Sequence, residues 1–198
     1  MLFDKQRLQE NNIMEYICTK YNVRNPKEMR TVYIKGIIPL LQNDYGERND
    51  CTLTSILTVA NFFKKPISLS DEYKKIEKIA TKFFYNGNFG TLPFFIRSIM
   101  KRVYPDKKAK SAYIKNIGFN QYDIAYQLDE NNPVILSVFN DGRNFYKNHS
   151  ITIVGYKSYL VSCGNAVHLF MVYDNWSKTI SYVDYNALSA ISSINYYE

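Results

Sequence analysis

The chain has few of the residues that build disulfide frameworks or metal sites: its 198 residues include three Cys and two His. Three thiols, Cys18, Cys51 and Cys163, do not indicate the paired cysteines of a disulfide-stabilised secreted domain. Cys163 and His168 lie five residues apart, but a structural zinc site normally needs about four ligands. We therefore expect free thiols, no metal and no organic cofactor.

Long apolar segments are also lacking. No apolar run approaches the length of a membrane span, so the sequence predicts no membrane-spanning helix. The opening stretch MLFDKQRLQENN has no apolar core of a secretory signal. We expect a soluble protein without membrane contact, cytoplasmic if this N-terminus is native and secreted if a signal peptide has been removed. The oligomeric state stays open.

Positive charge is in excess but unevenly placed. The net charge is +7, and residues 64–115 carry 13 Lys or Arg against 4 Asp or Glu. Such a segment can attract an acidic partner or nucleic acid, or it can form the solvent-facing sides of helices. Because no Arg, Gly and aromatic signature of nucleic-acid binding accompanies it, we favour helix faces and expect no nucleic-acid partner.

Hydrophobic periodicity predicts helices first and strands last. Helical spacing indicates helices in residues 4–21, 51–63, 68–84, 91–103 and 119–132, and 32–42 should be extended. Ser70 and Thr91 are the expected caps of the third and fourth helices, and Asn120 with Asp123 resembles a capping pair. Runs rich in β-branched and aromatic residues predict strands in 133–139, 150–156, 168–174 and 179–185. This segregation predicts an α+β fold with an antiparallel sheet.

Cys51 occupies the first turn of the second predicted helix, after Asn49 and Asp50 as possible caps. Free N–H groups and a partial positive charge at a helix N-terminus favour thiolate over thiol. That environment activates a cysteine as a nucleophile. The alternative interpretation is that Cys51 is a small buried residue of the core.

His149 stands at the head of the apolar run SITIVGY. It can be an ordinary polar residue at a strand end, or a general base next to a nucleophile. If residues 149–156 and 168–175 form a symmetric hairpin with Tyr156 opposite Val167, His149 falls opposite Asp174. Directly opposed side chains share a face of the sheet. The Asp174 carboxylate could then orient the imidazole, and Asn175 would point to the other face.

A nucleophilic mechanism also needs donors for the developing oxyanion. The backbone N–H of Cys51 is one candidate. Gln42 or Asn49, both upstream in the stretch QNDYGERNDC, could supply a side-chain amide as the second.

These three stretches together, NDC at a helix start, NHSITIVGY and VYDNW, resemble the active-site motifs of papain-like cysteine peptidases, and most closely the C39-like branch. The resemblance covers about residues 32–190 and implies a papain-like fold. It implies a peptidase domain at 32–198, preceded by a helical extension at 1–31. It further implies Cys51 as nucleophile, His149 as base and acid, Asp174 as the residue that orients it, and Trp176 as a cover for that pair. The implied substrate is a peptide or protein.

Two other functions remain open at this point. Transglutaminases and arylamine acetyltransferases use Cys, His and Asp in the same order, so the chain could transfer an acyl group to an amine. It could also be an inactive peptide-binding module on the same fold. The function favoured by the sequence is hydrolysis of peptide or amide bonds through an acyl-enzyme.

Overall fold

The computed structural model describes residues 7–46, 49–139, 145–146, 148–162 and 165–198. The helices are α1 (Ile13–Tyr21), α2 (Cys51–Lys64), α3 (Leu69–Thr81), α4 (Pro93–Val103) and α5 (Gln121–Asp129), with short 3-10 turns η2 (Glu10–Asn12) and η3 (Tyr185–Ala187). The strands are β1 (Lys27–Tyr33), β2 (Ala109–Tyr113), β3 (Val134–Val138), β4 (His149–Ser162), β5 (Asn165–Tyr173), β6 (Ser181–Asp184) and β7 (Ser193–Tyr197).

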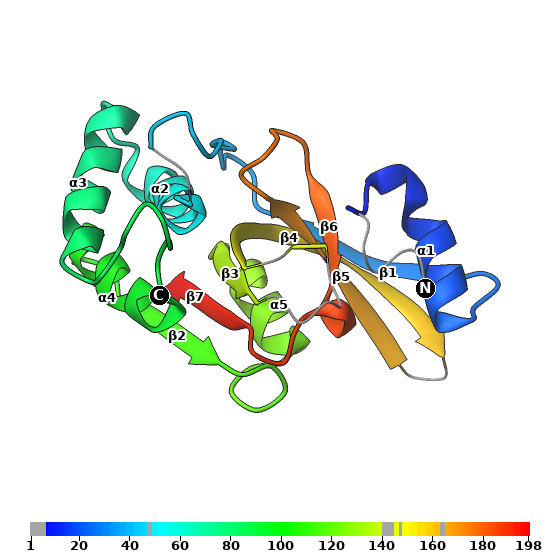
Figure 1. Cartoon of the computed structure of the whole chain (residues 1–198). Coiled ribbons are helices and arrows are strands. Elements are labelled where there is room, and N and C mark those ends of the chain that lie inside the picture. The colour runs from blue at the N-terminus through cyan, green and yellow to red at the C-terminus, as the bar shows by residue number, and fades with distance from the viewer. Residues whose placement is uncertain (1–6, 47–48, 140–144, 147, 163–164) are drawn as a thin grey trace.

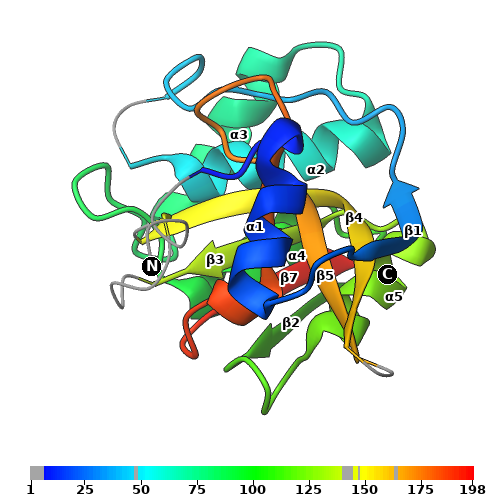
Figure 2. The same ribbon diagram turned by 90° about the vertical axis from the view of Figure 1, so that its right-hand side faces the viewer.

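All strands join one antiparallel sheet in the order β2-β7-β3-β4-β5-β6, with β1 paired to β4. Helices α2, α3 and α4 gather at one end of the molecule, and α1 lies at the other end (Figure 1). The view along the perpendicular direction shows α1 in front of the sheet and α2 and α3 behind it (Figure 2). The α+β architecture predicted from the sequence is confirmed.

Two apolar cores hold these layers together. One joins the sheet to α1 and α5, and includes Ile17, Ile124 and Leu136. The other joins α2, α3 and α4 to the opposite face of the sheet, where Ile135 and Tyr197 contribute. Every residue of α2 from Thr52 to Ala60 is buried, because this helix has neighbours on all sides. An apolar helix of this kind belongs in a core.

Local capping differs from the sequence prediction at two helices. Ser68, not Ser70, caps α3, and its Oγ accepts from the N–H of Asp71 at 3.2 Å. Helix α4 begins at Pro93, so Leu92 and not Thr91 is the N-cap. The fixed φ of proline suits the first helical position. The capping box of α5 between Asn120 and Asp123 is present as predicted.

Strands β4 and β5 are longer than predicted, and their predicted register is wrong. Their connection is only residues 163–164, because Ser162 pairs with Asn165. Tyr156 therefore lies opposite Phe170, and a bulge between Ile153 and Gly155 shifts the register again. A Cβ on Gly155 would approach the backbone oxygen of Val32 to 2.3 Å. The Gly-Tyr of the motif therefore marks a close approach between the paired strands β1 and β4, where Tyr33 lies opposite Gly155.

The N-terminal segment is packed onto the same core as the rest of the chain. Ile13, Tyr16 and Ile17 of α1 are buried there, and Tyr16 donates from its hydroxyl to the Asp184 carboxylate at 2.7 Å. The predicted boundary between residues 31 and 32 falls inside β1, which pairs with β4. The structure shows continuous packing across that boundary.

Replacing Ile17 by Ala tests this packing. Ile17 is fully buried, and we expect its truncation to lower the free energy of unfolding by about 2–5 kcal/mol. Urea unfolding, followed by circular dichroism and by Trp176 fluorescence, should show one transition for both signals. Met14→Ala on the exposed side of α1 is the control and should change the free energy by less than about 0.5 kcal/mol. A separate early transition in the Ile17→Ala protein would mean that α1 unfolds independently.

Candidate active site

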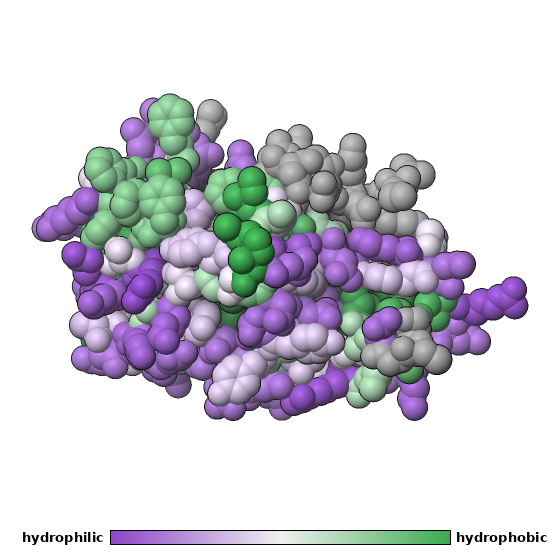
Figure 3. Space-filling model, turned by 90° about the horizontal axis from the view of Figure 1, so that it is seen from below, coloured by the Kyte–Doolittle hydropathy of each residue, from purple (hydrophilic) through white to green (hydrophobic). Residues whose placement is uncertain are grey.

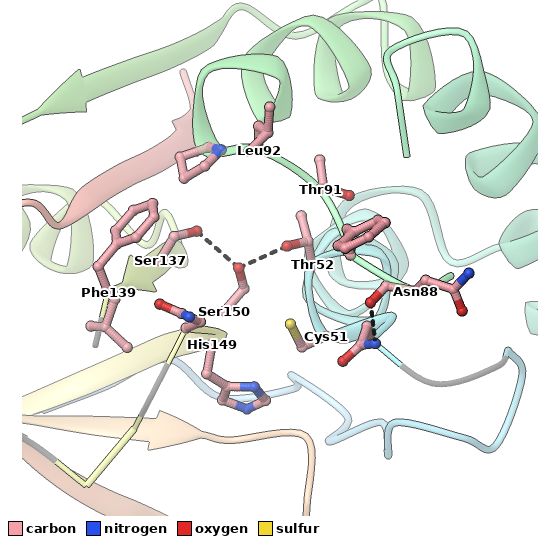
Figure 4. Close-up of a pocket in the computed structure, with 15 residues that line it drawn as sticks. Cys51, Thr52, Asn88, Thr91, Leu92, Ser137, Phe139, His149 and Ser150 are labelled. Atoms are coloured by element: carbon pink, nitrogen blue, oxygen red, sulfur yellow. Dashed lines mark hydrogen bonds between the residues drawn. The ribbon is translucent and has the colours of Figure 1, made fainter. Parts of the chain in front are cut away.

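Cys51 and His149 lie in the wall of one cavity of about 420 Å³. Cys51 comes from the first turn of α2 and His149 from the first position of β4. Figure 4 shows Cys51 at the start of α2 and His149 at the start of β4 among the residues that line this cavity. Residues separated by almost a hundred positions in the chain therefore meet at the junction between the helical layer and the sheet.

The backbone of Asp174 holds the imidazole. Nε2 of His149 lies 2.7 Å from the Asp174 carbonyl oxygen. A carbonyl only accepts hydrogen bonds, so Nε2 carries the proton in this contact and Nδ1 keeps its lone pair. The neutral ring is therefore a base at Nδ1. The sequence expectation that the Asp174 side chain faces the ring is not met, because the β4–β5 register differs from the symmetric hairpin.

The Asp174 carboxylate instead organises the turn that follows β5. Its Oδ1 accepts from the N–H groups of Trp176 and Ser177 at 3.1 and 3.2 Å. Its Oδ2 forms an ion pair with Arg7 at 2.6 Å and accepts from Tyr146 and Ser181 at 3.3 and 3.5 Å. The carboxylate is fully buried. It fixes the turn, and the turn presents the carbonyl to His149.

Two aromatic rings enclose the imidazole. Trp176 is stacked on His149 with ring centroids 4.2 Å apart, and Tyr146 is stacked at 5.9 Å. Trp176 stays 48% exposed, whereas His149 is buried. The indole therefore lies between one face of the imidazole and solvent.

Asn175 connects the nucleophile helix to the histidine strand. Its Nδ2 lies within 3.0 Å of three acceptors, namely the carbonyl oxygens of Cys51 and Ser150 and the Oγ of Ser55. Its backbone adopts φ 63°, a left-handed conformation that Asn tolerates better than most residues. One side chain thus fixes the distance between α2 and the start of β4.

A row of hydrogen-bonded hydroxyl groups connects α2 with β3 and β4. Ser150 Oγ lies 2.8 Å from Thr52 Oγ1 and 2.9 Å from Ser137 Oγ (Figure 4). All three residues are buried. Satisfied buried hydroxyls of this kind favour one arrangement over others, because each would lose a partner if α2 moved relative to β3 and β4.

The two side-chain oxyanion candidates lie in different places. Asn49 lines the cavity, but both donors of its amide are directed at the carbonyl oxygens of Gly87 and Asn88, at 3.1 and 3.0 Å. An oxyanion role for Asn49 does not fit these contacts. Gln42 is outside the cavity lining, and its backbone N–H donates to the Asn175 carbonyl at 2.7 Å. No side chain caps the first turn of α2, which leaves the Cys51 backbone N–H as a candidate donor.

Burial favours the neutral forms of both reactive groups. Burial raises the pKa of the Cys51 thiol, and the nearby Ser150 N–H only partly offsets this effect. Burial lowers the pKa of His149, against the opposing influence of the Asp174 carbonyl and charge. The helix N-terminus was expected to favour thiolate, but desolvation is the larger effect here. The resting pair is a thiol beside a neutral imidazole.

Asp50 is a buried carboxylate next to the nucleophile that the sequence suggests only as a cap. Its Oδ2 accepts from Tyr73 at 3.1 Å and from Thr54 at 3.3 Å, and burial raises its pKa. Its charge adds to the increase in the pKa of Cys51. No sequence signal distinguishes it from an ordinary N-cap, because its burial depends on packing by Tyr73 of α3.

The opposite wall of the cavity comes from the loop before α4 and the end of β3. Phe89 and Leu92 of the loop and Phe139 after β3 give it an apolar character, and Asn88 and Asn148 add amides. The sequence identifies residues 86–91 as a loop but gives no signal that it borders the site. In the described part of the chain, no group of three or more His, Cys, Asp or Glu could hold a metal ion. Within the same residues, no helix is long and apolar enough to cross a bilayer.

Comparisons with known proteins identify the family and the fold. The model of the Peptidase_C39 like family matches residues 34–198. A crystal structure described as a C39-like peptidase from Bacillus anthracis superposes with a TM-score of 0.57 at 12% identity, covering 86% of this chain and 98% of that one. This likeness confirms the papain-like fold predicted from the sequence.

A second solved structure is a double glycine motif protease from an AMS/PCAT transporter, in complex with the leader peptide. It has a TM-score of 0.48 and 15% identity, over 85% of this chain and 99% of that one. A search of curated proteins finds no match.

Replacing Asp50 by Asn tests the electrostatic environment of the thiol. The change keeps the shape and removes the negative charge that raises the Cys51 pKa, so Cys51 should react severalfold faster with iodoacetamide at pH 8. Peptide mapping by mass spectrometry measures the rate at Cys51, and Cys18 in the same protein is the internal control. An unchanged Cys51 rate would show that the carboxylate does not influence the thiol.

Proposed function

Because the chain belongs to the peptidase C39-like family, we propose that it is a cysteine peptidase that hydrolyses peptide or amide bonds. The observation that carries the proposal is that Cys51 and His149 line one cavity, with Nε2 of His149 2.7 Å from the Asp174 carbonyl oxygen. That contact leaves Nδ1 as the base for the thiol. These two groups support hydrolysis through an acyl-enzyme.

In the first half of the reaction, Nδ1 of His149 removes the thiol proton as Cys51 Sγ attacks the substrate carbonyl carbon. The proton transfer accompanies attack, because both groups are neutral at rest. The oxyanion that develops on the substrate is stabilised by the backbone N–H of Cys51 at the start of α2. The stacked Trp176 limits the access of water to the imidazolium while it exists.

In the second half, the imidazolium gives its proton to the leaving amine, and the C–N bond breaks to leave a thioester on Cys51. His149 then removes a proton from a water molecule, which attacks the thioester carbonyl. The carboxylic acid product leaves and the thiol recovers its proton. Asp174 acts in this scheme through its backbone carbonyl, with its side chain fixing the turn.

The cavity favours substrates with uncharged side chains at the cleavage site. Among its described lining residues there is no Lys, Arg, Asp or Glu. A charged substrate side chain would lose hydration there without gaining an opposite charge. Phe89, Leu92 and Phe139 instead offer contacts to apolar side chains.

Cys51→Ala should abolish cleavage of a peptide library read by mass spectrometry, with the thermal unfolding temperature nearly unchanged. His149→Ala should reduce kcat/KM by at least about 10³-fold, because the base is lost. Cys18→Ala is the matched control and should keep full activity, since Cys18 lies on α1 outside the cavity. Turnover by the Cys51→Ala protein would refute the proposal.

The pH profile tests the base. His149 must be neutral to accept the thiol proton, and burial lowers its pKa below the ordinary value of 6.5. The acid limb of kcat/KM for the wild-type protein should therefore lie below pH 6.5, with activity rising as pH increases through it. A limb above pH 7 would contradict the buried, neutral imidazole.

Substrate preference is tested by placing a charge in the cavity wall. Wild-type cleavage sites should be flanked by uncharged side chains, and Leu92→Lys should increase cleavage next to Asp and Glu by severalfold. Ile67→Lys is the control, because Ile67 is fully exposed and does not line the cavity. Equal profiles for Leu92→Lys and wild type would remove Leu92 from the substrate-binding surface.

A further inference from the structure

Two cations from the N-terminal segment reach buried carboxylates of the sheet. Arg7 pairs with Asp174 at 2.6 Å, and Lys20 pairs with Asp184 at 3.1 Å. Both carboxylates have no exposed side-chain surface, and the two cations are 26% and 23% exposed. Both cations lie outside the part of the chain matched by the family model. Only the first pair is adjacent to the candidate site.

The Arg7 guanidinium contacts several side chains at the turn after β5. Its Nε reaches Asp174 Oδ2 and donates to Ser181 Oγ at 2.7 Å, while Nη2 donates to Ser177 Oγ. The neighbouring residue Leu8 is fixed by a bridge to Tyr182, whose N–H donates to the Leu8 carbonyl at 3.0 Å. The guanidinium therefore contacts both sides of the segment from 174 to 181.

The same turn carries the two groups that hold the imidazole. Asp174 contributes the carbonyl that accepts from Nε2, and Trp176 contributes the ring stacked on His149. The N–H of Trp176 is bonded to the carboxylate that Arg7 neutralises. A buried carboxylate without its cation is strongly unfavourable, so loss of Arg7 would disturb the turn and, through it, the ring.

We propose that Arg7 is a positioning residue for the catalytic base, acting through Asp174 to fix the tautomer and the orientation of His149. The N-terminal segment is then part of the active site and not only an addition to the fold. The proposal rests on the assignment of His149 as the base, which the peptidase function requires.

Among the described residues, three ionisable groups lie around His149 and Arg7 at this site. Cys51 of α2 lines the same cavity as the ring, Tyr146 stacks on the ring from the segment before β4, and Asp174 after β5 accepts from it through its carbonyl. Arg7 is the cation paired with Asp174. Removing Arg7 leaves the negative charge of Asp174 less compensated, and this charge favours the protonated ring.

The test uses the chain's two histidines and needs no substrate. ¹⁵N-labelled wild-type protein should show His149 as the Nε2–H tautomer when neutral. In the Arg7→Ala protein, His149 should become a mixture of tautomers and titrate at higher pH than in wild type. His168 on β5, whose ring packs edge-on against Tyr122 and tilted against Tyr156, is the internal reference and should not change. His168→Gln assigns the signals.

Two further variants separate positioning from general support. Lys20→Ala removes the matched ion pair with Asp184 and should leave the tautomer and titration of His149 as in wild type. Arg7→Lys keeps the charge, so His149 should titrate as in wild type. The loss of the guanidinium contacts should change the His149 tautomer only partly. If the wild-type protein cleaves a peptide, Arg7→Ala should also lower kcat/KM by about 10- to 100-fold. The rate is normalised to the concentration of Cys51 that can be alkylated.

The outcomes are distinguishable from a failure of the proposed function. If no peptide is cleaved by the wild-type protein, the tautomer measurement still decides the role of Arg7. An Arg7→Ala protein with wild-type His149 tautomer and titration, even at lower thermal stability, would overturn the proposal. Equal changes at His149 and His168, or the same His149 change in Lys20→Ala, would also overturn it.

Discussion

The hydrogen bond between His149 Nε2 and the Asp174 carbonyl is the contact on which the site depends. It determines which ring nitrogen carries the proton, and therefore which one can act as base toward Cys51. A carbonyl is a weaker partner for an imidazolium than a carboxylate, so its position must be well fixed. The buried Asp174 carboxylate does this by holding the turn through two backbone N–H groups and Arg7.

The site lies where the two cores of the molecule meet. Cys51 begins a helix that is buried among α3, α4 and the sheet, and His149 begins the central strand β4. Hydrogen bonds of Asn175 and of the hydroxyls of Thr52 and Ser150 connect the start of α2 with the start of β4. Their positions therefore depend on the packing of both layers.

Apolar side chains also remain exposed over the helical end of the molecule, as the face in Figure 3 shows.

Much of the fold could be predicted because its signals are local. Periodicity located the five helices, and the capping box at Asn120 needed only a spacing of three residues. Strands β1, β2 and β7 were missed, and the extended segment predicted at 32–42 overlaps only the end of β1. Each is short and pairs with a distant part of the chain, and the pairing of β2 with β7 joins residues at least 80 positions apart. The predicted register of β4 with β5 was wrong because the strands run on to Ser162 and Asn165 and contain a bulge between Ile153 and Gly155, where Gly155 lies close to the paired strand β1.

The sequence by itself determined the residue types and local placements of the site: a thiol at a helix start, a histidine at a strand start, and Asp-Asn-Trp after a strand. These follow from short-range pattern and resemblance. Only the tertiary structure decided that Asp174 meets the ring through its backbone, that Asn49 is occupied by the loop at Gly87, and that Arg7 reaches the site. Such contacts join distant segments, and their geometry depends on how two packed layers fix each other.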